Sequence, residues 1–167
     1  MLSDYGLYAG AAILALWFWK SAYLVKEWER GVVVRLGRPL PEAKGPGLQV
    51  VWWPVEVLYK VSLAIQVAEA APEVLITGDE KPLKVAAKCQ YRVENPHLVL
   101  TRIYNHNYFM GELLKKNVYD IVRKSERKSL ISSVEHANEQ LRGVLDREST
   151  DAGIRTLGAE IRVIELL

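Results

Sequence analysis

An uncharged run of 15 residues, from Tyr5 to Trp19, constrains this chain more than any other feature of its sequence. As a helix the run is about 22 Å long, shorter than the roughly 30 Å hydrocarbon core of a bilayer. Continuing to Val25 lengthens the helix to about 31 Å and adds one charge, Lys20, whose aliphatic stem lets its ammonium reach the headgroups. Residues 5–25 are therefore predicted to form a spanning or deeply inserted membrane anchor.

The aromatic residues support this prediction. All five tryptophans lie within the first 53 residues, and tryptophan and tyrosine are enriched where membrane meets water. The predicted membrane-contacting residues of the anchor form one belt at each end: Tyr5 and Tyr8, then Trp17, Trp19 and Tyr23.

Other identities for this segment fit less well. A cleaved signal peptide begins with basic residues and ends in small ones, whereas this segment begins Met1-Leu2-Ser3-Asp4 and ends in bulky aromatics. A buried soluble helix that is apolar on all sides needs more surrounding chain than follows here. A half-inserted hairpin remains an alternative to a spanning helix.

The charges flanking the anchor predict its orientation. Asp4 is the only charged residue before it, and five basic residues follow closely: Lys20, Lys26, Arg30, Arg35 and Arg38. Cationic flanks stay on the cytoplasmic side. A single-pass protein with its folded part in the cytoplasm is expected.

The composition argues against several function classes. A net charge of +2 gives no basic face for nucleic acid. One cysteine, Cys89, cannot form an intramolecular disulfide or a multi-cysteine metal site. With three histidines and no nucleophile–base–orienter set, the sequence predicts a non-enzymatic protein without catalytic residues, metal or cofactor.

The first half of the folded part is predicted to be rich in strands. Residues 31–37 are β-branched between glycines, and prolines and glycines over 39–47 predict turns. Strand patterns follow at 55–67 and 73–77. Residues 84–93 alternate so regularly that Cys89 is expected on the buried face, as a small hydrophobic side chain.

The second half is predicted to be mostly helical. Asn95 and Pro96 favour a helix start, and Asn107 is expected to cap a longer helix. A third helix is predicted over 134–152, with Gly153 as the residue that ends it and a final strand over 154–166. Because the helices are clustered rather than interleaved with strands, the fold class is α+β.

Several stretches, in this order, resemble the SPFH or band 7 family of stomatins, prohibitins and flotillins, and most closely its stomatin-like branch. The resemblance covers about residues 20–167 and rests on Val25–Arg38, Lys44–Leu48, Pro54, Glu73–Thr77, Tyr91–Pro96, Asp151–Ile154 and Glu160–Val163.

The resemblance implies a transmembrane helix followed by an SPFH domain with a β-rich first subdomain and an α/β second subdomain. The expected divisions are an anchor at 1–25, a β-rich membrane-facing part at 26–72 and an α+β part at 73–167. Relatives assemble into rings or cages and usually continue into a coiled coil, which would begin where this chain ends.

Trp52 and Trp53 are the predicted membrane-contacting residues of the folded part. They lie between a Gly-Pro-Gly turn and Pro54, which suggests a stiff, exposed tip that inserts between headgroups. The alternative is that one or both fill the β core.

The two long helical segments carry opposite charge, +3 over residues 112–128 and −3 over 135–151. Such faces can steer copies head to tail. The expected oligomer interface comprises Lys115, Lys116, Arg123, Lys124, Glu135, Glu139, Asp146 and Glu148. Alternatively, the helices are neighbours within one protomer or solvated faces, or the basic cluster at 123–128 contacts anionic lipid.

Together these features predict a non-enzymatic, membrane-anchored scaffold that self-assembles to organise a membrane microdomain and its resident proteins. Its expected partners are membrane lipid, further copies of itself and a membrane protein client. The alternative is a regulatory subunit of a membrane protease complex, as some relatives are.

Overall fold

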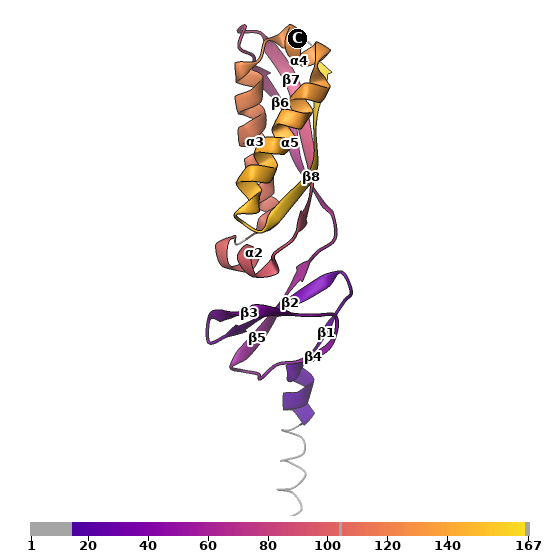
Figure 1. The fold of residues 1–167 in the computed structure, drawn as a ribbon, viewed down its shortest axis with the longest axis vertical. Helices are drawn as coiled ribbons and strands as arrows, with labels where there is room; N and C mark the ends of the chain where they lie inside the picture. Colours follow the sequence, from indigo (N-terminus) through magenta and orange to yellow (C-terminus); the bar gives the residue numbers. More distant parts are fainter. Residues whose placement is uncertain (1–14, 104, 166–167) are drawn as a thin grey trace, which may run out of the picture. The chain divides into compact units, whose positions relative to one another are not determined.

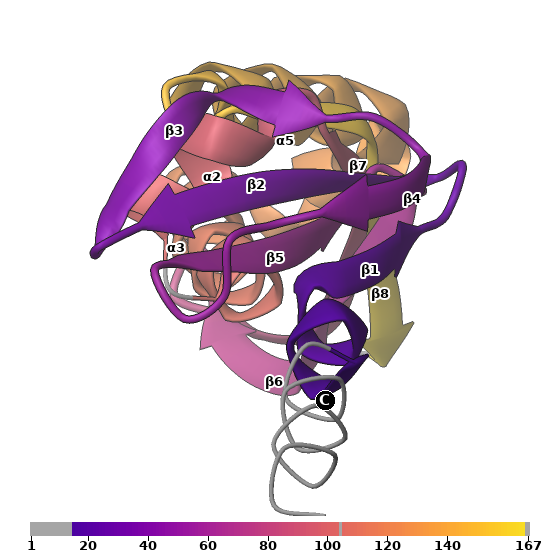
Figure 2. The same ribbon diagram turned by 90° about the horizontal axis from the view of Figure 1, so that it is seen from below.

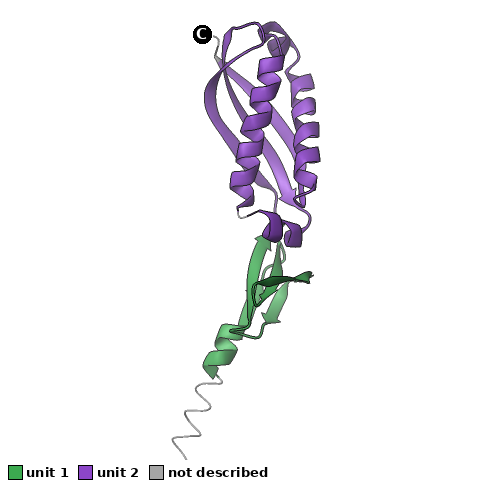
Figure 3. Ribbon diagram, turned by 90° about the vertical axis from the view of Figure 1, so that its left-hand side faces the viewer, with its two compact units in different colours: residues 1–63 green, residues 64–167 purple. Residues whose placement is uncertain are grey.

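A computed structural model of the chain describes residues 15–103 and 105–165 (Figure 1). The chain folds as two compact units, residues 1–63 and 64–167 (Figure 3). The first described residues, 15–21, are helical. Unit 1 ends at Leu63, before the expected boundary at residue 72, because the strand that follows pairs along its length within unit 2.

Unit 1 contains two small antiparallel sheets. One is a three-stranded sheet of order β3-β2-β5, and the other is a ribbon of β1 and β4. The strands are β1 (Ala22–Val25), β2 (Glu29–Arg35), β3 (Arg38–Lys44), β4 (Gly47–Val50) and β5 (Glu56–Ser62). Figure 2 shows the end of the helix leading directly into β1.

A compact set of aliphatic side chains forms the core of unit 1. Val25, Val33, Val51 and Leu58 are buried together, with Tyr23 packed against them. Gly31 permits this packing, because a Cβ at its position would lie 2.9 Å from Leu58. Val25 of β1 and Val51, which follows β4, thus join the ribbon to the larger sheet through Val33 and Leu58.

The predicted anchor helix over 5–25 is wrong at its C-terminal end. The helix ends at Ser21, and residues 22–25 are strand β1. The Val51 amide donates to the Ser21 carbonyl oxygen at 2.9 Å, β4 pairs with β1, and Val25 is buried. Strand pairing and burial therefore outweigh continuation of the helix.

Of the helices within residues 15–103 and 105–165, none combines the length and the hydropathy that a membrane crossing needs. The predicted transmembrane helix is thus not found there. Tyr5, Tyr8 and the rest of residues 5–14 of the predicted anchor lie outside the described residues.

Two further predictions for unit 1 are corrected. Residues 38–44 form strand β3 rather than turns. Prolines at 39 and 41 are tolerated there because β3 is an edge strand, whose outer N–H groups need no ladder partner. The strand expected over 55–67 is divided between two strands. β5 ends at Ser62, the Leu63 amide donates to the Trp28 carbonyl, and the next strand begins at Gln66.

Unit 2 is an antiparallel sheet of order β6-β7-β8, with α3 packed on β6 and β7, and α5 on β8 (Figure 1). Its elements are β6 (Gln66–Ile76), β7 (Pro82–Val93), α2 (Pro96–Arg102), α3 (His106–Lys124), α4 (Arg127–Ser132), α5 (Val134–Thr150) and β8 (Ile154–Glu165). The clustered helices confirm the α+β class.

The alternation along β7 is confirmed residue by residue. Val85, Ala87, Cys89, Tyr91 and Val93 are all buried. The large buried side chains of the helices are Met110 and Leu114 of α3 with Leu141 and Leu145 of α5. One face of the sheet and the apolar stripes of two helices thus make the core of unit 2.

The cap of α2 is confirmed, and that of α3 is corrected. The Asn95 side chain accepts from the amides of His97 and Leu98 at 3.1 and 3.3 Å. For α3 the cap is Asn105, not Asn107. Both residues are asparagines, and sequence alone could not decide between them; Asn107 instead lies 3.3 Å from the Tyr91 hydroxyl.

The junction after α5 requires glycine, as predicted. Gly153 has a φ of +77°, and a Cβ there would lie 2.8 Å from the Asn95 carbonyl oxygen. The amides of Glu94 and Asn95 both donate to the Gly153 carbonyl. The turn into β8 is thereby fixed against the start of α2.

Candidate membrane-facing site

Three tryptophans lie together at the junction of the helix and the loop after β4. The Trp17 indole N–H donates to the carbonyl oxygen of Trp53 at 2.8 Å, and the rings of Trp17 and Trp52 meet edge to face at 6.0 Å. We call these three residues the tryptophan cluster. The contact joins the helix to a loop 36 residues further along the chain.

The cluster is exposed rather than buried in the core. The exposed fractions are 71% for Trp52 and 39% for Trp53, whereas the preceding residue, Val51, is completely buried. The alternative in which one or both indoles fill the β core does not match the structure, because Val51 belongs to the core cluster of unit 1 and neither indole does. Trp19 of the same helix is 85% exposed.

A buried carboxylate supports the loop that carries the cluster. Glu56 accepts from Arg35 through Nε at 2.8 Å and Nη2 at 2.6 Å, and from the backbone amide of Trp52 at 3.1 Å. The Trp52 amide and then Arg35 hold the pKa of Glu56 below its ordinary value of 4.5. The loop is thus closed by an ionised side chain, at the start of β5.

The β1–β4 ribbon extends the exposed apolar surface. Leu24 pairs directly with Leu48, and Val50 lies two residues further along the same side of β4. All three are exposed. We call them the ribbon face. Contiguous exposed apolar side chains of this kind mark surfaces that contact another molecule or a membrane.

Two lysines border the same region. The Lys20 ammonium lies 5.0 Å from the centre of the Trp53 ring, and that of Lys44 donates to the carbonyl oxygen of Val50 at 3.0 Å. Aromatic, aliphatic and cationic groups thus meet on one surface, as they do in proteins that sit at the headgroup level of a bilayer.

A family model for the SPFH domain, band 7 family, matches residues 23–166 of the chain. This chain belongs to the SPFH/band 7 family. Its stomatin-like character is shown by its relatives.

Three of these relatives illustrate the similarity. A stomatin homologue of Pyrococcus horikoshii is 30% identical over 86% of this chain and 53% of its own length. Mouse stomatin is 28% identical over 89% of this chain and 52% of its own length. An uncharacterised protein of Archaeoglobus fulgidus is 31% identical over 92% and 61%. The chain thus spans about half the length of the curated relatives it matches.

The residues predicted to contact the membrane are divided by the structure. It brings Trp17, Trp52 and Trp53 together and exposes Trp19, but it packs Tyr23 against the core of unit 1. The ribbon face was missed by the sequence analysis, because Leu24 was assigned to a helix. The stretch from Gly47 to Val50 reads Gly-Leu-Gln-Val, and an alternation of only four residues that begins with glycine is a weak strand signal.

The predicted interface residues of this SPFH domain also fall into separate groups. Lys116 and Glu148 pair within the chain at 3.4 Å, which joins α3 to α5. The Asp146 side chain accepts from the Thr156 amide at 3.0 Å, and Lys115 pairs with Glu112 at 3.1 Å. Arg123 lies 6.0 Å from the Tyr119 ring centre, whereas Lys124, Glu135 and Glu139 are exposed.

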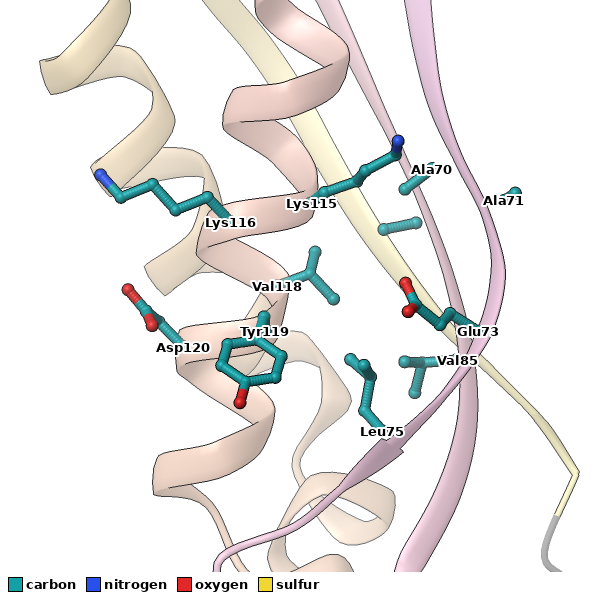
Figure 4. Close-up of a pocket in the computed structure, with 11 residues that line it drawn as sticks. Ala70, Ala71, Glu73, Leu75, Val85, Lys115, Lys116, Val118, Tyr119 and Asp120 are labelled. Carbon is teal, nitrogen blue, oxygen red and sulfur yellow. The ribbon is translucent and has the colours of Figure 1, made fainter.

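Unit 2 has an open groove of about 250 Å³ between β6 and α3 (Figure 4). It lies where the β6–β7 register shifts between Ala70 and Glu73. Its lining includes Leu75, Val85 and Val118 along with Lys115 and Tyr119. The small side chains around the bulge leave this space, and the Glu73 carboxylate and the Lys115 ammonium group both line it.

The thiol of Cys89 is unsuited to nucleophilic chemistry. It is completely buried, and burial raises its pKa to about 11. Nearby, the Tyr91 hydroxyl contacts the side-chain oxygens of Gln66 and Asn107 at 3.2 and 3.3 Å, and burial raises its pKa to about 12. His106, whose pKa is lowered by burial, completes this group by a 3.0 Å contact with Gln66, which fixes the start of α3 to β6.

Proposed function

We propose that this protein is a non-enzymatic membrane scaffold whose unit 1 lies on the bilayer through the tryptophan cluster and the ribbon face. The observation that carries the proposal is the hydrogen bond from Trp17 to Trp53. It joins an exposed indole loop to the end of the apolar N-terminal segment, so both reach the same headgroup layer.

The energetics favour this arrangement. At about 25 cal/mol per Å² of apolar surface removed from water, burial of two indoles contributes several kcal/mol. Leu24, Leu48 and Val50 add aliphatic surface that is exposed in the isolated chain. A domain held at two places, by its N-terminal segment and by this surface, is restricted in its tilt relative to the membrane.

The flanking charges support a cytoplasmic position for residues 26–167, with the N-terminal segment as the single membrane pass. Lys20, Lys26 and Arg30 follow the apolar run within a short distance, against Asp4 before it.

Self-association through unit 2 completes the proposed function. In unit 2, α3 packs on β6 at one edge of the sheet and α5 on β8 at the other. The exposed cation Lys124 and the exposed carboxylates Glu135 and Glu139 are suited to a head-to-tail contact between copies. Lys116 and Glu148 are excluded from this set, because they pair within one chain.

Fluorescence quenching in vesicles tests the membrane contact. The full-length chain is reconstituted into phosphatidylcholine vesicles that carry bromine near the headgroup end of the acyl chains, and quenching of tryptophan fluorescence is measured. We expect Trp52→Ser/Trp53→Ser to remove a strongly quenched component while leaving the unfolding temperature nearly unchanged.

The matched control is Trp28→Ser. Trp28 has an exposed indole and lies in the turn between β1 and β2. Its backbone carbonyl accepts from the amide of Leu63, the last residue of unit 1. If the double variant unfolds several kcal/mol more easily and its remaining fluorescence is quenched as before, the pair stabilises the fold instead, and the proposal fails.

Charge reversal tests the assembly. Glu135→Lys/Glu139→Lys is expected to reduce the size of the particle in nanodiscs or mild detergent, and Lys124→Glu in the same chain is expected to restore it. Particles of unchanged size in both variants would exclude this interface.

A further inference from the structure

We infer that the membrane-facing site selects anionic phospholipids, with Lys20 and Lys44 as the residues that bind their phosphate groups. The inference rests on the proposed function, and it adds the lipid class to the membrane contact proposed there. It is carried by the placement of the two ammonium groups within an otherwise apolar surface.

Both ammonium groups are held at defined places on the site. Lys20 lies over the Trp53 ring, 5.0 Å from its centre, and Lys44 donates to the Val50 carbonyl at 3.0 Å. The next amide along the chain, that of Val51, bonds to the Ser21 carbonyl at 2.9 Å. The lysines thus border the point where the helix, the ribbon and the tryptophan loop join.

Their position relative to the apolar groups sets the depth at which they would act. Trp52, Leu48 and Val50 are exposed around them. When these side chains enter the interface, the ammonium groups come to the level of the lipid phosphates, where lysine side chains are favoured.

The local charge is positive after internal pairing is considered. Glu56 is the carboxylate at the base of the loop, and it forms an ion pair with Arg35 at 2.6 Å. Lys44 also acts on Glu56 through its charge. Across residues 15–63 there are seven basic and four acidic residues. Residues 15–63 therefore carry excess positive charge, and Lys20 and Lys44 are the cations placed at the site itself.

The experiment measures which lipid lies beside the tryptophans. The full-length chain is reconstituted into vesicles of equal parts phosphatidylglycerol and phosphatidylcholine, with bromine on one of the two lipids at a time. Each cation near an anionic surface is worth about a fivefold local enrichment. Brominated phosphatidylglycerol should accordingly quench tryptophan fluorescence more strongly than brominated phosphatidylcholine.

Substitutions assign the preference to the two lysines. Lys20→Gln/Lys44→Gln should bring the two quenching values close together, and glutamine keeps a donor for the Val50 carbonyl. Lys60→Gln is the matched control, since Lys60 is an exposed lysine near the far end of β5 from Glu56, and it should leave the preference unchanged. If the double variant does not fold, the single variants Lys20→Gln and Lys44→Gln are measured separately, and each should reduce the preference.

Salt gives an independent measurement. Raising the ionic strength from about 0.1 to 1 M shortens the screening length from about 10 to 3 Å, and the preference should fall with it. Equal quenching by both lipids in the wild type, or a preference that the double variant retains, overturns the inference.

Failure of the proposed function itself has a different signature. In that case Trp52→Ser/Trp53→Ser changes quenching by neither brominated lipid, whatever the lipid preference. Strong quenching that depends on the indole pair but is equal for the two lipids leaves the membrane contact supported and removes only the lipid selectivity.

Discussion

Replacing Glu56 by glutamine should loosen the tryptophan loop and destabilise unit 1. Glu56 is 4% exposed and accepts two bonds from Arg35 and one from the Trp52 amide. Glutamine has nearly the same shape but offers one acceptor oxygen and an amide group that faces donors.

The expected loss follows from these contacts. A hydrogen bond to a charged group contributes about 1.5–3 kcal/mol, but the Arg35 side chain is 56% exposed, so water recovers much of its share. Glutamine retains one acceptor for the Trp52 amide or for Arg35. We therefore expect Glu56→Gln to lower the free energy of unfolding by about 1–3 kcal/mol.

The difference should depend on pH in one direction. The pKa of Glu56 in the folded chain lies below its ordinary value of 4.5, so the unfolded chain takes up a proton first as the pH falls. The stabilisation is thus fully present above pH 4.5 and is lost as the pH falls through the lower pKa of the folded chain. Below that point, wild type and Glu56→Gln should unfold alike.

Thermal unfolding of the full-length chain in detergent, followed by tryptophan fluorescence from pH 7 to pH 3, measures both effects. Glu42→Gln, an exposed carboxylate of β3 in the same unit, is the matched control and should differ little from wild type at any pH. A Glu56→Gln variant that melts with the wild type at pH 7, or one whose deficit persists undiminished at pH 3, would refute the reasoning.

Three other predictions concern unit 2. Cys89→Ser should lower the free energy of unfolding by about 1–3 kcal/mol, because it places a hydroxyl in an apolar core. The native thiol, whose pKa is raised to about 11, should react with thiol reagents only after unfolding. Rapid labelling of the folded chain would contradict this. Gly153→Ala should cost about 1–3 kcal/mol in chemical denaturation, because φ is +77° and the new Cβ meets Asn95, whereas Gly143→Ala, in an open helical position, should be neutral or stabilising by up to about 1 kcal/mol. Gln140→Cys in a Cys89→Ala background should resist impermeant reagents in intact cells if unit 2 is cytoplasmic, and labelling without lysis would exclude that orientation.

Local patterns predicted much of unit 2. The alternation at β7 identified the buried face, and Asn95, Pro96 and Gly153 identified both ends of a junction, because each of these signals depends on neighbours within a few residues. α4 was not predicted: its start is capped by Asp79 of the β6–β7 turn, which accepts from the Arg127 amide at 3.0 Å. No local cap marks this helix in the sequence.

Unit 1 was predicted less well, since its structure depends on contacts between distant segments. An apolar run gives no sign of where a helix yields to a strand, and that point is set by the pairing of β1 with β4. The site shows the same limit. Exposure of Trp52 and Trp53 was predicted from their setting between a turn and a proline, but the contact with Trp17 requires the fold.

The direct passage from helix to strand at Ser21 has a mechanical consequence. No flexible linker separates the two: Ser21 is buried and bonded to Val51, and the next residue already pairs in β1. Torque applied to residues 15–21 is passed directly to the sheets of unit 1. Under the membrane attachment proposed above, a bilayer that reorients this segment would turn the sheets with it. A flexible glycine–serine insertion between Ser21 and Ala22 would let residues 15–21 rotate independently of the sheets. The domain would stay attached, but its orientation would no longer follow that of the N-terminal segment.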